Sequence, residues 1–520
     1  MHFQMLRFCE NTRFTHVLRA LPPQSVDKAA RDVDAAILTA LEDYLGWPEM
    51  PDSHVSARYV AARRMLRGPI REGGFGLTSA HDIRYPAFYH AAAHSLRWIC
   101  NMPSLVELLG WDLSQQPRTI PNSFVGEFCD AEEQLLWHGC TRPLDTSARP
   151  SGETALLPAW TDLIFPQPTG SFFPIPPQRV VVRSHLVEKH PSTSPDFHDT
   201  FPFMCNRKLQ AIRDHTSSPL KDLLGFTKKQ KETATITYNP MAFLMAIPAT
   251  KWQLFPKHLF KTWTRLALDL PFEDSTPICK FCGQQQDDTG HHRATCPKAT
   301  SVAWKRGHAH VVEALASVLD TAGMLHTSKE AEIPTHADSG KKGDLLVQCQ
   351  VGPFEKLVLD FSLTHPRSGR SRLHPIGQWK PDAVAHTARR KDAKHAIQYE
   401  QTQHAFLSLT ADTYGKLSED FVRFIWMVAN TAASANSRPS QPESDNTPPS
   451  SSQLDTFALT RGSYFSRMRV QIGAAIAKAA AVRFLADNTT DSLPLPTHWD
   501  RRSPAKAAPL PDLPLYHAPC

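Results

Sequence analysis

The chain has 520 residues, of which 41% are apolar and 21% charged, and its formal charge is +6. This balance is ordinary for a soluble globular protein, and the length is enough for about three or four domains with buried cores. The mild basic excess is compatible with a polyanionic partner without requiring one. The 43 prolines and the long Ser/Pro stretches indicate that part of the chain is connector.

Neither a secretion signal nor a membrane span is expected. The first residues, MHFQMLRFCENTRF, lack the basic-then-apolar plan of a signal peptide. The most apolar long stretch, Tyr85–Met102, contains histidines and Arg97. The chain has ten cysteines, and three of them lie in one short window, which favours metal binding over disulfides. This cysteine usage also indicates a reducing compartment. We therefore expect a nuclear or cytoplasmic protein with no membrane partner.

The first 110 residues are predicted to be mainly helical. Residues Val26–Leu45 space four apolar side chains four positions apart, as one face of a helix requires: Val33, Ile37, Leu41 and Leu45. A glycine-rich turn follows, and Ser79 after it is a typical helix cap. The next helix is expected to continue through Ala91–Trp98.

Residues 111–275 are predicted to be a proline-rich linker that contains helical segments. Helical periodicity returns within it at Asn206–Leu223 and at Phe255–Leu268. From residue 276 the composition changes to a short Cys/His cluster, which we expect to form a separate knuckle over residues 276–300.

The clearest strand-turn-strand pattern of the chain lies in the region 301–433. Two apolar runs, LLVQCQV and KLVLDFSL, are joined by a turn at Gly352 and Pro353. Helices are predicted before this hairpin and after it: Val302–Leu319, Asp382–Ala405 and Leu417–Ala433.

The C-terminal part is predicted to contain one helix between two irregular segments. Residues 434–453, SANSRPSQPESDNTPPSSSQ, have the composition of a disordered linker. A basic, alanine-rich helix at Tyr464–Asp487 follows within the segment 454–490, and a proline-rich tail covers 491–520.

The Cys/His cluster has the spacing of a tetrahedral zinc site. Cys279 and Cys282 place two thiolates across a tight turn, His292 follows after nine residues, and Cys296 comes four positions later. Two thiolates on a knuckle, an imidazole and a third thiolate match the ligands that zinc prefers. This set leaves no position open for water, so we expect structural zinc. His291 is the alternative to His292, because spacing alone does not separate them.

Two aspartates flank the predicted hairpin. Asp344 precedes the first strand and Asp360 lies late in the second, within an apolar run. Pairing the strands about the turn brings both carboxylates to the open end, within reach of one divalent cation such as Mg²⁺ or Mn²⁺. The alternative for each is a strand-end aspartate that faces solvent or pairs with a basic residue, and Asp344 follows Lys341 and Lys342 closely.

A basic helix follows the hairpin in the sequence ARRKDAKHAIQYEQ. Lys391, Lys394 and Gln398 are spaced three and four apart, so they share one helical face, and Tyr399 flanks it. A lysine beside a metal ion orients the attacking water and neutralises the charge of a phosphoryl transition state. The alternative is a solvated basic face.

At these residues the chain resembles the C-terminal region of non-LTR retrotransposon reverse transcriptase polyproteins that carry a restriction-like endonuclease. The matching segments occur in the same order over nearly the whole chain. They are RFTHVLRALPP, PIREGGFGLTSAHDIRYPAF, AFLMAIP, the Cys-x2-Cys…His-x3-Cys knuckle, KRGHAHVV, the acidic strand pair, the A…K-x2-K…Y helix and FLSLTADTYGKLSEDF.

The resemblance implies a multidomain protein with a mainly α N-terminal region, a small zinc knuckle and an α/β restriction-like endonuclease domain. Residues 1–110 would be the thumb-like region. Asp344 would be the first metal-binding acid and Asp360 the second, with Lys391 or Lys394 as the catalytic lysine; Glu330 or Glu332 would be an upstream acid. The implied partners are target DNA and the element's RNA, with no small-molecule substrate.

The chain departs from the family pattern in ways that bear on its activity. Gly343 stands where the family has proline, no lysine follows Asp360 in its strand, and fifteen residues separate Asp344 from Asp360. The polymerase signature, an aromatic-x-Asp-Asp hairpin, is absent, so we expect a fragment or truncated copy without polymerase activity.

Two functions follow as expectations. The first is a metal-dependent endonuclease that nicks target DNA for target-primed integration. The second is a catalytically inactive nucleic-acid-binding remnant. In both, phosphates would be bound by basic stretches that include Arg367–Arg372 and the pairs Lys305–Arg306 and Arg389–Arg390.

Overall fold

The computed structural model describes the chain in separate ranges. These are residues 3, 13–47, 57–67, 75–111, 123–137, 242–245, 255–272, 278–279, 281–296, 298, 300–328, 343–351, 353–369, 376–380, 383–436 and 451–485. Several expectations lie outside these residues, namely the helix Asn206–Leu223, the acids Glu330 and Glu332, and the tail 491–520.

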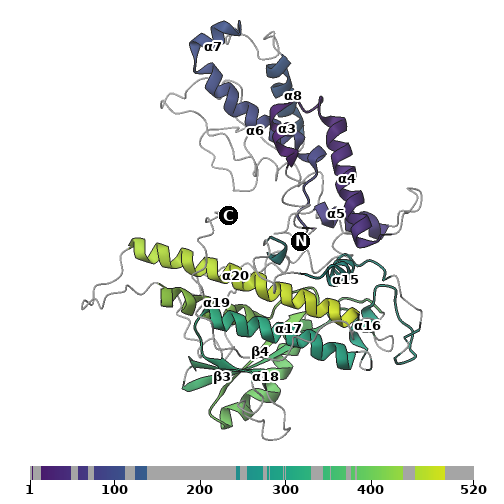
Figure 1. Ribbon diagram of the computed structural model, residues 1–520, viewed down its shortest axis with the longest axis vertical. Helices are drawn as coiled ribbons and strands as arrows, with labels where there is room; N and C mark the ends of the chain where they lie inside the picture. Colours follow the sequence, from purple (N-terminus) through teal and green to yellow (C-terminus); the bar gives the residue numbers. More distant parts are fainter. Residues whose placement is uncertain are drawn as a thin grey trace.

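The described ranges combine many helices with one small sheet, as Figure 1 shows. The helices that precede the Cys/His segment are α3 (Thr15–Ala20), α4 (Asp27–Leu45), α5 (Ala57–Arg67), α6 (Ala80–Cys100), α7 (Pro103–Leu108), α8 (Ser123–Trp137), η5 (Ala242–Met245) and α15 (Lys257–Ala267). The elements that follow are α16 (His291–Thr295), α17 (Thr300–Thr321), β1 (His326–Thr327), β2 (Leu345–Val351), β3 (Phe354–Thr364), α18 (Ala383–Gln401), β4 (Ala405–Asp412), α19 (Glu419–Asn436) and α20 (Ser451–Phe484). None of the described helices combines the length and apolar character that a membrane span requires.

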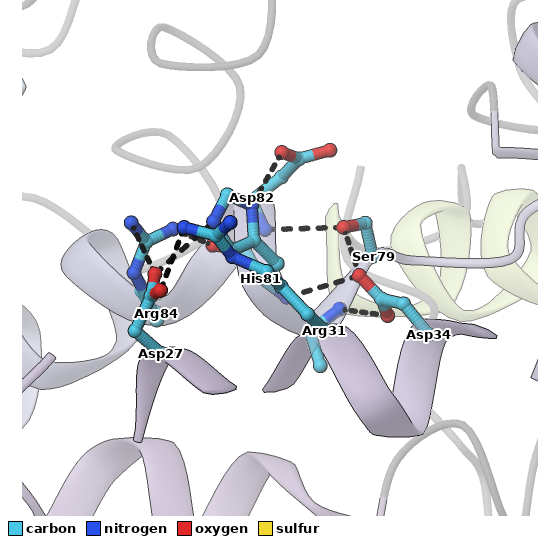
Figure 2. Close-up of polar contacts among 8 residues, drawn as sticks. Asp27, Arg31, Asp34, Ser79, His81, Asp82 and Arg84 are labelled. Carbon is cyan, nitrogen blue, oxygen red and sulfur yellow. Dashed lines mark hydrogen bonds and ion pairs between the residues drawn. The ribbon is translucent and has the colours of Figure 1, made fainter. Parts of the chain in front are cut away.

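The start of α6 is fixed by a cap from within the chain and by a second cap from α4 (Figure 2). Ser79 accepts a hydrogen bond from the Asp82 amide at 3.1 Å, as the sequence predicts. The buried Asp34 of α4 accepts from the Ser79 hydroxyl at 2.5 Å and from the Ala80 and His81 amides at 2.7 and 3.2 Å. A carboxylate at a helix N-terminus satisfies free amides and favours the helix dipole. These bonds join α4 to α6.

A second carboxylate on α4 reinforces the same junction. Asp27 pairs with Arg31 of its own helix at 2.7 Å, with Arg84 of α6 at 3.0 Å and with His81 of α6 at 3.2 Å (Figure 2). Arg84 is buried, so its pairing with Asp27 compensates for the loss of solvent. Helices α3, α4 and α6 also share a small hydrophobic core that includes Leu18, Ala30 and Ile83, so the three form one packed unit.

The C-terminal elements surround a four-stranded sheet in the order β1-β2-β3-β4. Strands β1, β2 and β3 pair antiparallel in turn, which confirms the predicted hairpin, and β3 pairs parallel with β4. Helix α18 provides the connection that a parallel pair requires. In Figure 1, α18 lies on one side of the sheet and α17, α19 and α20 lie on the other.

The two faces of β3 bury different side chains. Leu357, Leu359 and Phe361 point into the main core with α17, α19 and α20. Val358 points the opposite way and packs with Tyr399 of α18. This alternation follows from the two-residue period of a strand, and it puts Asp360 on the α18 face, because Asp360 lies two residues after Val358.

Strand β4 corrects the sequence prediction that a helix extends to Ala405. Helix α18 ends at Gln401, and the chain becomes a strand at Ala405. Ala405, Leu407 and Leu409 alternate into the main core, so a two-residue period was present in this segment. The strand is buried along its whole length, as a parallel strand between two helical layers is.

Helix α20 corrects two further predictions. It begins at Ser451 and ends at Phe484, and α19 reaches Asn436, so both ends of the predicted linker 434–453 are helical; residues 437–450 lie outside the described part. In addition, the helix predicted within the separate segment 454–490 packs against the rest of the fold. Its residues belong to two hydrophobic cores, with Ile472 and Ile476 in the sheet core and Ala480 and Phe484 in the core of α4, α5 and α15. Small alanine side chains permit this close packing on two sides.

Candidate metal centres

The structure gathers the four predicted zinc ligands at one point. One ligand atom each from Cys279, Cys282, His292 and Cys296 lies within 4.8 Å of the other three. The Sγ atoms of Cys279 and Cys296 are 4.0 Å apart, and the Sγ of Cys282 is 3.2 Å from the Nε2 of His292. Two of the three thiols are buried. This cluster can hold a metal ion such as zinc, because thiolate and imidazole are its usual ligands.

The first two cysteines are held by a tight turn. The Gly283 amide donates to the Cys279 carbonyl at 2.7 Å, and the Cys279 amide donates to the Gln284 carbonyl at 2.8 Å. Gly283 has a φ of 70°, a left-handed conformation that favours glycine. Both Sγ atoms consequently come to the same side of the turn.

The histidine ligand comes from the five-residue helix α16, which one carboxylate caps. Asp287 accepts hydrogen bonds from the His291 and His292 amides, each at 2.8 Å, and from the Thr289 hydroxyl at 2.5 Å. Burial acts to raise the pKa of Asp287, but the charge of His291 and these hydrogen bonds outweigh it and lower the pKa. The carboxylate therefore stays ionised and holds the short helix in place.

The structure separates the two adjacent histidines that the sequence left open. His292 directs Nε2 at Cys282, while its Nδ1 lies 2.8 Å from the Gly369 carbonyl oxygen. That carbonyl accepts a hydrogen bond from the protonated Nδ1, which leaves the lone pair of Nε2 free to bind a metal ion. His292, and not His291, completes the cluster.

His291 belongs to a different buried chain of polar groups. Its Nε2 lies 3.2 Å from an Asp269 carboxylate oxygen, and its Nδ1 lies 3.1 Å from the Nε2 of His365. His365 in turn contacts the Thr413 hydroxyl at 2.7 Å. Burial, with the nearby positive charges, lowers the pKa of His365 well below its ordinary value, so this imidazole is neutral. These contacts connect α15, the Cys/His segment and the end of β4.

Asp344, which directly precedes β2, lies opposite Asp360 of the neighbouring strand β3. Leu345 pairs with Leu359, and continuing this antiparallel register by one residue brings Asp344 opposite Asp360. The Asp344 Oδ2 accepts a hydrogen bond from the Phe361 amide at 2.6 Å. Burial raises the pKa of Asp360, the charge of Asp344 raises it further, and Lys391 opposes both. Each carboxylate thus lies within the electric field of the other.

Of the two lysines on α18, Lys391 contacts this pair of aspartates and Lys394 does not. The Lys391 Nζ lies 2.8 Å from the Asp360 Oδ2 and 3.3 Å from the Phe361 carbonyl oxygen. Lys394 is exposed, one turn further along the helix. The Tyr399 hydroxyl, also from α18, accepts a hydrogen bond from the Gly343 amide at 2.9 Å.

Gly343 suits this contact better than a proline would. Proline has no amide proton to donate to Tyr399. A Cβ atom at Gly343 would also approach the Val358 side chain to 2.4 Å. Glycine at this position therefore has a local structural reason.

His308 of α17 is a member of the cluster that the sequence reasoning missed. Its Nε2 lies 3.1 Å from the Asp344 Oδ2 and 3.3 Å from the Phe361 carbonyl oxygen. Burial acts to lower its pKa, but the hydrogen bond and charge of Asp344 outweigh it, so the pKa is raised. A signal existed in the sequence, because His308 precedes the buried Val311 and Leu315 at helical spacing in one apolar stripe.

The predicted phosphate-binding residues have different surroundings. Arg389 and Arg390 are exposed on α18. Arg367 is buried; it lies 3.6 Å from Asp269 and packs over the Trp379 ring, so the prediction that it binds phosphate is wrong. The side chains of Lys305 and Arg306, and residues 370–372, lie outside the described part of the chain.

No protein-family model matches the chain, and no curated protein matches it either.

Proposed function

We propose that this chain is a metal-dependent DNA endonuclease, derived from a retrotransposon polyprotein, that nicks target DNA for target-primed integration. The proposal is supported above all by the position of Lys391, whose Nζ lies 2.8 Å from the Asp360 Oδ2. Asp360 in turn lies opposite Asp344 in the register of β2 and β3. A restriction-like nuclease needs two acids and a lysine at one sheet end. Here the lysine comes from a helix instead of from the strand.

The donor groups at this end of the sheet fit a hard divalent cation. Asp344 and Asp360 provide carboxylate oxygens, and the Phe361 carbonyl provides a third oxygen beside them. Mg²⁺ and Mn²⁺ prefer such ligands and would activate a bound water when present. The Lys391 ammonium, held by Asp360 and by the Phe361 carbonyl, would neutralise charge on the attacked phosphate.

The surroundings of the pair also support this reading. Asp360 is largely shielded from solvent, and a buried charge is costly without a counter-ion. The exposed Arg389 and Arg390 lie on the same helix as Lys391, so a phosphate backbone bound by them would run past the carboxylates. We include α17 to α20 and the sheet in the proposed α/β endonuclease domain.

We further propose that the Cys/His cluster holds structural zinc. All four ligands come from the chain, and the Gly369 carbonyl orients the His292 ring. No position is left for a reacting water. The zinc would fix α16 against the turn of Cys279 and Cys282.

A specific observation favours the second candidate, an inactive nucleic-acid-binding remnant. Among the described residues, the ligand atoms of the Cys/His cluster lie within 4.8 Å of one another, and those of Asp344, Asp360 and His308 do not meet this criterion together. Asp344, Asp360 and His308 are thus more widely spaced, and each carboxylate already has a cationic partner.

Nicking of a supercoiled plasmid by the full chain separates these two functions. With Mg²⁺ or Mn²⁺, we expect the wild-type chain to nick the plasmid, and Asp360→Asn to lower the rate at least about a hundredfold while DNA affinity is retained. Lys391→Met should show a similar loss. Lys394→Met, the matched control one turn away, should retain most of the activity.

Wild-type protein that binds DNA without nicking it would favour the inactive remnant. Equal losses in the Lys391 and Lys394 variants would contradict the role given to Lys391. A chain that binds no DNA at low salt would contradict both candidate functions.

A further inference from the structure

The pair of aspartates is asymmetric in its partners. Asp360 faces the ammonium of Lys391, which is no metal ligand while it is protonated, whereas Asp344 faces the imidazole of His308. Imidazole is a common metal ligand in proteins. Once a cation displaces the proton on its Nε2, His308 offers a nitrogen ligand beside the Asp344 carboxylate.

The distances from the His308 Nε2 to the two nearby oxygen atoms match those between neighbouring ligands in an octahedral metal site. The His308 Nε2 lies 3.1 Å from the Asp344 Oδ2 and 3.3 Å from the Phe361 carbonyl oxygen. Two adjacent ligands of an octahedron with bonds of about 2.1 Å lie about 3 Å apart. Each oxygen therefore lies at a distance from the His308 Nε2 that suits two ligands of one cation.

The frame around His308 is well suited to hold its ring. Gly307, the preceding residue, lies so close to α20 that a Cβ there would come within 2.9 Å of the Ala479 carbonyl oxygen. Val311, one turn further along α17, is fully buried in the sheet core. The helix is thus fixed against α20 on one side and against β3 on the other, and His308 has little freedom to leave Asp344.

We propose that His308 is a nitrogen ligand of the catalytic metal ion, and that it makes the centre selective for a divalent transition-metal cation such as Mn²⁺ over Mg²⁺. This inference rests on the proposed endonuclease function. Mg²⁺ takes oxygen ligands and water almost exclusively, whereas first-row transition metals bind imidazole readily. Replacing one oxygen ligand with the His308 nitrogen therefore shifts the metal preference of the centre toward Mn²⁺. Asp344 and Asp360 would bind either metal.

Mn²⁺ binding to the full zinc-loaded chain tests the proposal without any assay of activity. Free Mn²⁺ is measured by electron paramagnetic resonance, and the Mg²⁺ affinity is obtained from the displacement of bound Mn²⁺. Bound Mn²⁺ in the wild-type chain should also show spin-echo modulation from a histidine nitrogen. The preference for Mn²⁺ over Mg²⁺ should be at least about tenfold.

His308→Gln distinguishes a ligand from a group that only positions Asp344. The glutamine amide can still donate a hydrogen bond to the Asp344 carboxylate but has no imidazole nitrogen. We expect this variant to lose at least about tenfold in Mn²⁺ affinity, to lose the nitrogen modulation and to keep its Mg²⁺ affinity within about threefold.

His310→Gln is the matched control on the same helix. His310 is half-buried, and its nearby charge is Lys478 of α20, so it lies on a different side of α17 from Asp344. Its substitution should leave both metal affinities and the nitrogen modulation unchanged.

The remaining outcomes distinguish a failure of this inference from a failure of the proposed function. An unchanged Mn²⁺ preference in His308→Gln, or equal losses of Mn²⁺ and Mg²⁺ affinity, would show that His308 is no metal ligand. Loss of both affinities in Asp360→Asn supports the proposed centre independently of His308. A wild-type chain whose Mn²⁺ binding does not depend on Asp360 would instead contradict the proposed function.

Discussion

The Nδ1 atom of His292 lies 2.8 Å from the carbonyl oxygen of Gly369, 77 residues further along the chain. This bond joins the Cys/His cluster to the segment that follows β3. The side chain of Arg293 makes a second connection, because it donates to the Phe484 carbonyl at the end of α20 at 2.9 Å. The cluster is therefore part of the C-terminal fold and is no separate knuckle.

Substitution of Gly369 should weaken metal binding. A Cβ atom there would lie 1.8 Å from the Thr295 hydroxyl oxygen and 2.5 Å from the His291 carbonyl oxygen, so the loop must move away from α16. We expect Gly369→Ala to lower zinc affinity about 10- to 100-fold, measured by competition with a chromophoric chelator. Gly126→Ala, where a Cβ meets nothing within 4 Å, is the control. Equal zinc affinity in Gly369→Ala and in wild type would contradict the orienting role of the carbonyl.

The two adjacent histidines should respond differently to alanine substitution. Elemental analysis should give about one zinc per wild-type chain and clearly less in His292→Ala. His291→Ala should keep its zinc but lower the free energy of unfolding, because Asp269 loses its close contact with the imidazole and His365 loses a buried hydrogen-bond partner. Loss of zinc from His291→Ala with retention in His292→Ala would reverse the assignment.

Asp412 should make the free energy of unfolding dependent on pH. Burial raises its pKa from 3.8 to about 7. Between these values the folded chain holds a proton that the unfolded chain releases, so stability falls as the pH rises through this window and is lowest above the folded pKa.

Asp412→Asn should remove this dependence. The amide oxygen can still accept from the Tyr414 and Lys416 amides, and the Asp412 Oδ2 has no hydrogen-bond partner to lose. We expect the variant to gain up to a few kcal/mol over wild type at about pH 8 and almost nothing near pH 4, since one pKa unit corresponds to about 1.4 kcal/mol. Urea unfolding at several pH values measures the difference. A gain that is constant with pH would rule out the titration of Asp412 as its source.

The N-terminal helices should depend on the cap that α4 provides. Asp34→Ala leaves the Ser79 hydroxyl and the Ala80 and His81 amides without their acceptor. We expect a loss of about 1–3 kcal/mol and faster amide exchange at the start of α6. Asp32→Ala, an exposed position on the same helix, should change stability by less than about 0.5 kcal/mol. Similar effects in both variants would mean that Asp34 acts through net charge alone.

DNA affinity should depend on salt through the exposed arginines of α18. Neutralising Arg389 and Arg390 together with glutamine should weaken binding to unrelated duplexes alike and lower the slope of log affinity against log salt by about 1 to 2. Titrations at several salt concentrations measure this slope. An unchanged slope would place the phosphate contacts on another surface.

Much of the local structure was predictable because it follows from periodicity and capping. The helix Asp27–Leu45, the Ser79 cap and the hairpin of β2 and β3 were all expected from residue patterns. The four metal ligands could be proposed from spacing, since a knuckle and a short helix bring nearby residues together without the rest of the fold.

The rest depended on contacts between distant segments. The sequence did not distinguish His291 from His292, or Lys391 from Lys394, because each pair lies within one turn of helix and differs only in what packs against it. The sequence pattern predicts a helix up to Ala405 and no strand after it, because a strand buried on both faces carries little polar contrast.

The sequence by itself determined most of the helices, the hairpin that puts Asp344 opposite Asp360, and the three cysteines of the Cys/His cluster, because these depend on local spacing. Only the tertiary structure decided that α17 brings His308 to Asp344 and that α20 is shared by two cores. It also decided that Gly369 orients the ligand His292. These contacts join segments far apart in sequence, and their geometry is set by helix packing and close glycine contacts that no local pattern encodes.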